Sequence, residues 1–227
     1  MQRLSNQIAV LDAAHDQLLS RWVEMNQSLD AHDPRIRDTF LPMIPIGGWV
    51  VDGGACLGSH ATVYAERAAH VLAVEPSPRT AACLRYNVAH LPNIDVVEVA
   101  LLDTERTVWL VPNVVNAGAT VVGEESDAGA IRVPTTTLDR LCGEWPRLDF
   151  VKLDVEGLVL RALEGARAVL TRWHPIVIAE VGDNLSLFGD STERVIAFMR
   201  GLGYVCEPLP QFDDGGVWDV CFKWRHA

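Results

Sequence analysis

The spacing of apolar residues along the chain changes near Trp49. Before that point, apolar residues recur at intervals of three, four and seven positions, and this pattern predicts one amphipathic helix over residues 5–30. Its apolar face would consist of Ile8, Leu11, Leu18, Trp22 and Leu29. Because Pro34 follows and cannot continue the helix, we assign residues 1–46 to an N-terminal helical extension and residues 47–227 to a larger domain.

From Trp49 onward, short apolar runs alternate with stretches of helical periodicity. Strands that are apolar throughout and alternate with helices indicate an α/β fold, in which helices cover both faces of a parallel sheet. The expected strands are Trp49–Val51, Val71–Val74, Ile94–Val99, Phe150–Leu153 and Ile176–Val181, and the expected helices lie near residues 58–69, 78–90, 157–170 and 191–202.

Two parts of the chain depart from this alternation. Between the third and fourth strands, Thr107–Val111 and Ile131–Val133 have the composition of extra strands around a glycine-containing loop. Near the C-terminus, Gly203–Cys206 and Val217–Phe222 are strand-like, and no helix fits between them. This last pair predicts an antiparallel hairpin at the edge of the sheet.

A glycine-rich turn follows the first strand and reads Asp52-Gly53-Gly54-Ala55-Cys56-Leu57-Gly58. Glycine allows positive φ and a close approach to a ligand, and the carboxyl ends of parallel strands form the ligand crevice. A dinucleotide fingerprint has the spacing GxGxxG and places a pyrophosphate at a helix N-terminus. Here Asp52, Gly54 and Gly58 form DxGxxxG, and the leading carboxylate favours a ligand that carries an ammonium and a sulfonium.

The second strand ends at Glu75. A carboxylate in this position accepts hydrogen bonds from ribose hydroxyls, which both NAD and S-adenosylmethionine (SAM) carry. Three interpretations stay open for the glycine turn and the segment at Glu75: a SAM site, a nicotinamide-nucleotide site, or a tight turn with two incidental surface acids. The combination of Asp52, Gly54, Gly58 and Glu75 favours SAM.

Further motifs resemble the FkbM family of SAM-dependent methyltransferases. They run in order over about residues 48–181, and the Lys-x-Asp-x-Glu-Gly stretch at residues 152–157 is the most specific of them. The similar segments are Asp52–His60, Glu75-Pro76, Asn87, Thr137–Asp139, Val151–Gly157, Leu163–Ala166 and Pro175–Glu180. The resemblance implies a Rossmann-like class I methyltransferase domain over residues 47–227, with a mostly parallel seven-stranded sheet whose last strand is antiparallel.

The resemblance also implies methyl transfer, usually to oxygen, on acceptors such as sugars and secondary metabolites. Val159 stands where the family often has an acid, which weakens any catalytic role assigned to that position by analogy. The helix over residues 5–30 and the tail after residue 190 lie outside the firm match. We expect substrate-specific structure in these two regions.

Candidate catalytic residues follow the fourth and fifth strands, where the reactive centre of such a fold is expected. Transfer to a hydroxyl requires alignment of the acceptor and removal of a proton. We predict Asp154 and Glu180 for these roles, together with His60 after the glycine turn. A helix cap for Asp154 and a packing role for His60 are the structural alternatives. Lys152, inside the fourth strand, is interpreted as a surface or tethering charge.

Six residues are predicted to contact the cofactor: Asp52, Gly54, Gly58, Glu75, Leu101 and Asp154. Leu101 would form an apolar wall beside the adenine ring, and a plain core leucine is the alternative. Asn116 and Gly118 would belong to a lid over the cofactor, or else to an ordinary turn.

No metal site and no disulfide are predicted. Four hard oxygen ligands that suit magnesium follow the fourth and fifth strands, but acidic loops are also ordinary solvated turns. They are Asp154, Glu180, Asp183 and Asn184. The five cysteines are far apart in the sequence and form no CxxC pair, so we interpret them as reduced thiols, including Cys206 and Cys221 in the two C-terminal strands.

Composition narrows the choice of partner. Hydrophobic residues make up 49% and charged residues 22% of the chain, as in ordinary globular domains. The net charge of −11 disfavours nucleic acid and favours a small-molecule acceptor. Because apolar runs are short, we expect a cytoplasmic protein without a membrane partner. The helix that carries Trp22 would cover the active site or pair with a second subunit in a homo-oligomer.

Two other functions remain open from the sequence. One is a nicotinamide-dependent oxidoreductase, which a panel of cofactors in thermal unfolding would identify. The other is a non-catalytic SAM-binding partner protein, which would bind the cofactor and form S-adenosylhomocysteine with no acceptor.

Overall fold

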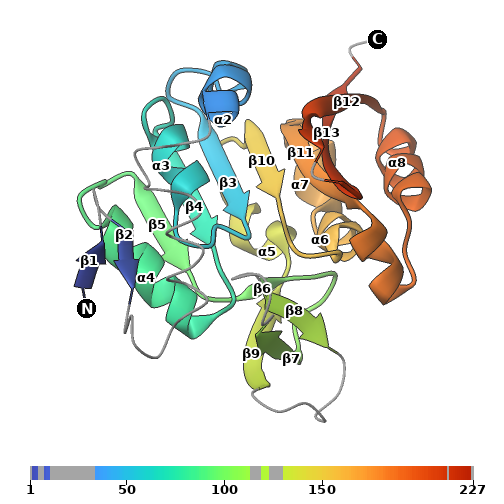
Figure 1. Cartoon of the computed structure of the whole chain (residues 1–227). Coiled ribbons are helices and arrows are strands. Elements are labelled where there is room, and N and C mark those ends of the chain that lie inside the picture. Colours follow the sequence, from blue (N-terminus) through green and yellow to red (C-terminus); the bar gives the residue numbers. More distant parts are fainter. Residues whose placement is uncertain are drawn as a thin grey trace.

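A seven-stranded sheet forms the centre of the molecule (Figure 1). The structure is a computed structural model that describes residues 2–4, 8–10, 34–112, 119–122, 130–213 and 215–225. In spatial order the strands are β12 (Tyr204–Asp213), β13 (Val217–Trp224), β11 (Ile176–Gly182), β10 (Phe150–Leu153), β3 (Trp49–Gly53), β4 (His70–Val74) and β5 (Ile94–Val97). All neighbours are parallel except β13, which is antiparallel to both β11 and β12.

This order confirms the predicted sheet and its C-terminal edge hairpin. From β3 the chain proceeds outward through β4 to β5, and β10 then returns to the other side of β3. The strand order therefore reverses between β3 and β10, and ligands of open α/β sheets bind at the carboxyl ends of strands next to such a switch point.

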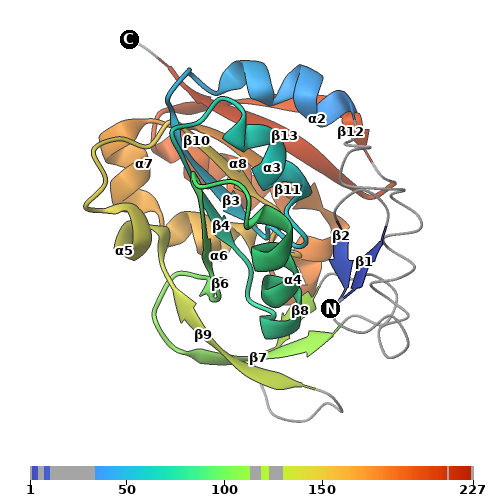
Figure 2. The ribbon, with the colours of Figure 1, turned by 90° about the vertical axis from the view of Figure 1, so that its left-hand side faces the viewer.

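Helices cover both faces of the sheet (Figure 2). One face packs against α2 (Pro34–Thr39), α3 (Ser59–Ala65) and α4 (Pro78–Val88). The other packs against α5 (Leu138–Cys142), α6 (Val159–Glu164), α7 (Arg167–Trp173) and α8 (Thr192–Gly201). Two 3-10 helices complete the described part: η1 (Leu41–Met43) and η2 (Asp183–Phe188).

The strand β10 shows how the sequence divides its side chains between these faces. All four of its residues are buried. Val151 and Leu153 join the core on the α6 side, while Phe150 joins the core on the α3 side. Since side chains alternate along a strand, Lys152 points to the α3 side together with Phe150. A charged residue thus lies under a layer of helices.

Two predicted elements differ in the structure. The single helix expected near residues 157–170 is divided into α6 and α7 at Gly165, where a Cβ atom would overlap the carbonyl oxygen of Leu102. Val159 lies in the core, as its apolar spacing indicates.

Most of the helix predicted over residues 5–30 lies outside the described residues. In the part that is described, Ile8–Val10 forms a strand, β2, that pairs with β1 (Gln2–Leu4), so the helix prediction is wrong at its start. The predicted lid residues Asn116 and Gly118 also lie outside the described part of the chain.

A second, four-stranded sheet lies beyond the carboxyl ends of the central strands (Figure 1). In spatial order it contains β6 (Ala100–Leu101), β9 (Ile131–Thr136), β7 (Thr107–Pro112) and β8 (Ala119–Val122). The two extra strands expected from the sequence are β7 and β9.

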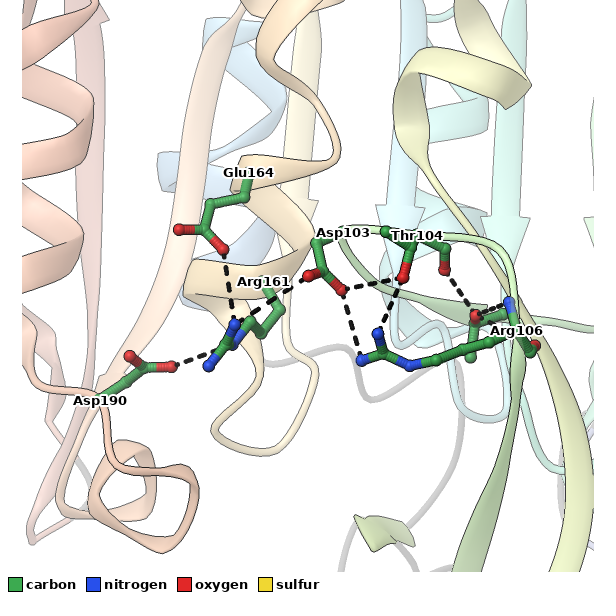
Figure 3. A network of polar contacts seen from close by, with 7 residues as sticks. Asp103, Thr104, Arg106, Arg161, Glu164 and Asp190 are labelled. Carbon is green, nitrogen blue, oxygen red and sulfur yellow. Dashed lines mark hydrogen bonds and ion pairs between the residues drawn. The ribbon is translucent and has the colours of Figure 1, made fainter. Parts of the chain in front are cut away.

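Charged residues join this second sheet to the helices (Figure 3). Arg161 of α6 forms ion pairs with Asp103 (4.0 Å), Glu164 (3.9 Å) and Asp190 (3.6 Å). Asp103 also pairs with Arg106 at 3.4 Å, ahead of β7. We call these residues, together with Arg194 on Asp190, the Arg161 network.

Candidate active site

The glycine turn after β3 lies against the end of β10. Gly54 has φ +83°, and a Cβ atom there would overlap the carbonyl oxygen of Asp154. Gly58 has φ +96°, and a Cβ atom would lie 2.7 Å from the side chain of Leu84. The amide of Asn87, one of the family-like positions, donates to the carbonyl of Leu57 at 3.0 Å and holds the turn. Both glycines are therefore required by close approach as well as by backbone conformation.

Asp52 is the buried carboxylate of this turn. It is 1% exposed, and among the described residues neither of its oxygens has a hydrogen-bond partner of ordinary geometry. Burial raises its pKa from 3.8 to about 7, although Lys152 and the backbone of Ala61 favour the charged form. A buried acceptor without a donor indicates a missing cationic or donating group. The ammonium of SAM is a group of this kind, so the residues present suit that cofactor.

Glu75 directly follows β4 and helps to shape the same turn. Its two oxygens accept hydrogen bonds from the backbone N–H groups of Cys56 (3.0 Å) and Ser77 (2.9 Å). Burial raises its pKa to about 7, while these two hydrogen bonds lower it. Each oxygen keeps a lone pair for a ribose hydroxyl, so the predicted cofactor contact is compatible with the structural one.

Leu101 lies beneath the turn, in the core. It is 3% exposed, and a Cβ atom at Gly53 would lie 2.8 Å from its Cδ1. The structure thus brings Leu101 next to the cofactor turn, and its contact with the adenine remains a prediction.

A cavity of about 150 Å³ opens beside this turn. Its polar lining comes from six residues: Arg35, His60, Lys152, Asp154, Glu180 and Asp219. The three predicted catalytic residues, Asp154, Glu180 and His60, are all among them. The cavity therefore collects side chains from α2, α3, β11, β13 and the end of β10.

Lys152 lies at the base of the cavity and is 1% exposed, so its interpretation as a surface charge is wrong. Its Nζ donates to Asp219 Oδ1 at 3.0 Å and lies 3.7 Å from Asp154 Oδ2. Burial alone would lower the pKa of Lys152, but the carboxylates of Asp219, Asp154 and Glu180 outweigh burial and raise it. The ammonium is therefore a permanent, buried tethering charge.

Glu180 is held at the cavity by Asn184, whose amide donates to Glu180 Oε1 at 2.8 Å. Burial and the neighbouring Asp154 raise the pKa of Glu180 to about 8, against the opposing effect of Lys152. A carboxylate with a pKa in this range is suited to accept a proton near neutral pH.

Asp154 connects the cofactor turn to the cavity. Its N–H donates to Gly53 at 2.9 Å, and its side chain is about one-third exposed. The helix-cap alternative is wrong, because α6 starts at Val159 after Leu158 and has no side-chain cap. The Asp154 carboxylate is thus available at the junction of the two regions.

His60 lies in the first turn of α3 among aromatic rings. Its ring stacks on Tyr64 at a centroid distance of 5.9 Å and meets the edge of Phe40 at 6.3 Å. Since His60 also lines the cavity, the structure combines the packing role with the position of a site residue. The hydroxyl of Tyr64 is fully buried and has no hydrogen-bond partner among the described residues.

The outer wall of the cavity comes from segments far apart in the sequence. The pairing of β12 with β13 shifts between Leu209 and Asp213, and this bulge directs Phe212 toward α2. Phe212 stacks on Phe40 at 4.7 Å, and the Arg35 guanidinium lies 5.2 Å from the centre of its ring. Arg35 also donates to the backbone carbonyl of Gln211.

Besides Lys152, six residues that line the cavity were not predicted as site residues: Arg35, Ile36, Phe212, Val217, Trp218 and Asp219. One signal was present for Asp219, because a charge within the apolar run Val217–Phe222 requires a buried partner. Lys152 gives the same kind of signal, because it is a charged residue within the apolar run of β10. Nothing in the sequence indicated that the bulge would bring Phe212 and Arg35 to the site.

The structure also bears on the metal site and the cysteine pairing that were considered from the sequence. Among the described residues, no group of three or more His, Cys, Asp or Glu side chains is arranged to hold a metal ion. None of the five cysteines, all of which lie within the described residues, forms a disulfide, and the β12–β13 register places Cys206 opposite Phe222 and Cys221 opposite Glu207.

The fold and the turn together define a class of protein. A sheet of this order, with a carboxylate-led glycine turn at its switch point, is the Rossmann-like fold of class I methyltransferases, and S-adenosylmethionine is its cofactor. The model of the Methyltransferase FkbM domain matches residues 52–206. The chain therefore belongs to the FkbM methyltransferase family, which favours the methyl donor over the nicotinamide alternative.

Solved structures share the fold at low sequence identity. An FkbM methyltransferase from Methylobacillus flagellatus KT is 16% identical, with a TM-score of 0.56 over 96% of this chain and 56% of that chain. A TehB-like SAM-dependent methyltransferase from Corynebacterium glutamicum is 14% identical, with a TM-score of 0.52 over 95% and 100%. Precorrin-6y C5,15-methyltransferase from Geobacter metallireducens GS-15 is 12% identical, with a TM-score of 0.52 over 83% and 88%. No curated protein matches the chain.

None of the helices that the structure describes is long and apolar enough to cross a membrane.

Proposed function

We propose that this protein transfers the methyl group of SAM to a hydroxyl of a small molecule, such as a sugar or a secondary metabolite. The observation that carries the proposal is the cavity beside the cofactor turn, with Glu180 and Asp154 in its lining. The cavity is small, at about 150 Å³, and its lining contains three carboxylates. These properties, and a net charge of −11, suit a small acceptor better than a nucleic acid.

The chemistry requires an aligned acceptor and a base. Bound SAM supplies a methyl group that is already activated for displacement. Glu180 accepts the hydroxyl proton, the acceptor oxygen forms the new bond to the methyl carbon, and the bond from that carbon to sulfur breaks. The products are a methyl ether, S-adenosylhomocysteine and protonated Glu180, so atoms and charge balance. Asp154 orients the acceptor, and the aromatic wall excludes water.

His60 is a second candidate base. It lines the cavity on the α3 side, opposite the strand that carries Glu180. Its stacking on Tyr64 fixes the plane of the ring, which suits an orienting role for the acceptor as well as proton transfer.

The test is a methyltransfer assay with SAM and a panel of monosaccharides, phenols and aliphatic alcohols. S-adenosylhomocysteine formation identifies an acceptor, and mass spectrometry of the product shows whether oxygen carries the methyl group. Glu180→Gln should lower kcat by about 10²- to 10⁴-fold, as expected for loss of a general base, while SAM binds as before.

Glu164→Gln is the matched control, since it removes one carboxylate from the Arg161 network. This variant should keep full activity. Methylation only of nitrogen would contradict the proposed acceptor atom. SAM binding without product from any acceptor would favour the non-catalytic partner protein instead.

A further inference from the structure

The ammonium of Lys152 has more hydrogen-bond donors than the surrounding protein uses. An ammonium carries three N–H groups. Among the described residues, the structure gives it one hydrogen bond, to Asp219 Oδ1 at 3.0 Å, and Asp154 Oδ2 at 3.7 Å is too distant for another. A fully buried ammonium that lines a cavity with unused donors indicates an oxygen atom of a ligand.

Carboxylates face this ammonium from every neighbouring strand. Lys152 pairs in register with Asp52 on β3, and on its other side Glu180 of β11 pairs in register with Asp219 of β13. The remaining titratable or charged groups nearby are Asp154 at the end of β10, His60 and Tyr64 on α3, and Arg35 on α2. Lys152 is thus the cation between the cofactor turn and the acceptor cavity.

We propose that Lys152 donates a hydrogen bond to the acceptor oxygen and stabilises the negative charge that forms on it during methyl transfer. This inference rests on the proposed function, because it assigns a role at the same site. Lys152 is then a catalytic residue, and Asp219 is a positioning residue that holds its ammonium in place.

The proposal is electrostatically consistent with a cavity rich in carboxylates. When the acceptor proton moves to Glu180, the net charge of the cavity does not change. Negative charge leaves Glu180, where it was close to Asp154, and moves to an oxygen beside the ammonium. Fixed donors at a developing negative charge are worth about 10²- to 10³-fold in rate. A hydroxyl both donates to Glu180 and accepts from Lys152, whereas a protonated amine has no lone pair for Lys152.

The experiment uses 4-nitrophenol, whose phenol and phenolate forms absorb at different wavelengths. The full-length protein is saturated with S-adenosylhomocysteine, and the bound probe is titrated by absorbance. In the wild type, the bound probe should ionise at lower pH than in solution, by about one pH unit or a tenfold change in the phenolate ratio. Without Lys152, the surrounding carboxylates should make it ionise at higher pH.

The double variant Lys152→Met/Asp219→Asn supplies the comparison, because it removes the ammonium together with its hydrogen-bonded counter-charge. Glu207→Gln/Lys223→Met is the matched control, as it removes an exposed ion pair from the same hairpin. The control should behave as the wild type does. If Lys152 serves folding alone, the bound probe should still ionise at lower pH than in solution when the double variant binds it. That result would overturn the proposal.

A crystal structure of the wild type with 4-nitrophenol decides the matter if the double variant does not fold. The phenol oxygen should lie within hydrogen-bonding distance of Lys152 Nζ. A phenol oxygen bound only by carboxylates, or a probe that does not enter the cavity, would overturn the proposal. Neither measurement requires turnover, so failure of the acceptor panel would count against the proposed function, whereas failure of the probe to contact Lys152 would count against the hydrogen bond proposed here.

Discussion

The molecule contains two clusters of charged residues that differ in balance and in burial. The Arg161 network combines three arginines with three acids, and every side chain in it except that of Asp190 is at least one-quarter exposed. In the Lys152 cluster, one buried ammonium is shared by four carboxylates: Asp52, Asp154, Glu180 and Asp219. The first cluster joins a peripheral sheet to α6. The second lies between a glycine turn and a cavity.

The difference indicates which cluster has a function beyond folding. Exposed and balanced ion pairs contribute little to stability and need nothing else to be complete. A buried excess of like charge is costly unless a ligand or a proton compensates it, and such groups occur preferentially at functional sites. The oxygens of Asp52 lack a hydrogen-bond partner of ordinary geometry, and Lys152 has spare donors, so the second cluster has unused polar groups at a cavity that a ligand could satisfy.

The largest difference in stability between the two clusters should appear when the central cation of each is removed, and the greater loss is expected for Lys152. Lys152→Met leaves several buried carboxylates without a counter-charge and should lower the free energy of unfolding by about 3–5 kcal/mol. Denaturant unfolding of the cofactor-free protein measures this change. A loss below 1 kcal/mol would show that the carboxylates are already neutral in the wild type.

The next largest difference between the two clusters should be in how stability depends on pH. Burial raises the pKa of Asp52 from 3.8 to about 7, of Glu75 from 4.5 to about 7, and of Glu180 from 4.5 to about 8. The folded state therefore binds more protons than the unfolded state between about pH 4 and 8. Stability from these groups is complete below pH 4 and is lost as the pH rises toward 8.

For Asp52 alone, the raised pKa corresponds to as much as ~4 kcal/mol across that range. Thermal melts of the cofactor-free protein from pH 5 to 8 measure the slope, and saturation with SAM should flatten it. Stability that rises with pH over this interval would contradict the assignment of buried acids.

Asp52→Asn addresses the cofactor end of the Lys152 cluster. Loss of a charged acceptor should weaken SAM binding by about 10- to 100-fold, equivalent to ~1.5–3 kcal/mol. The same change removes a buried charge, so the cofactor-free protein should become more stable at pH 8. Calorimetry and melts measure the two effects, with Asp103→Asn of the Arg161 network as the control. Unchanged affinity would exclude Asp52 as a contact of the ammonium.

The smallest effect should follow from Arg161→Met. Its three ion pairs are 3.6–4.0 Å long, its own side chain is 41% exposed, and the buried Asp190 keeps its pair with Arg194, so unfolding should become easier by at most ~1 kcal/mol. SAM affinity measured by calorimetry should stay the same. A tenfold loss of affinity would show that the second sheet takes part in cofactor binding.

The strands of the sheet were predictable because their signals are local. Apolar runs such as Phe150–Leu153 and the positive-φ glycines of the turn depend on short stretches of sequence. The predicted site residues Asp154, Glu180 and His60 meet at one cavity for the same reason, since strand ends and the first turn of α3 share one edge of the sheet.

Other features depend on contacts between distant segments. The division between α6 and α7 falls at Gly165, which lies against the backbone of Leu102, and periodicity within the helix does not reveal this contact. The sequence left Lys152 as a surface or a tethering charge, because its partner Asp219 lies 67 positions away, on β13, which is separated from β10 by β11 in the sheet. The start of the chain was assigned by spacing alone, and Ile8–Val10 adopts a strand instead.

The irregular outer strand β12 has a consequence for how copies of the protein can associate. Pro208 and Pro210 have no N–H group, and the bulge bends the chain away from the line of the sheet. A strand from another molecule would find an interrupted ladder of donors along this border. The hairpin side of the sheet is thus a poor border for strand pairing between two copies of the protein.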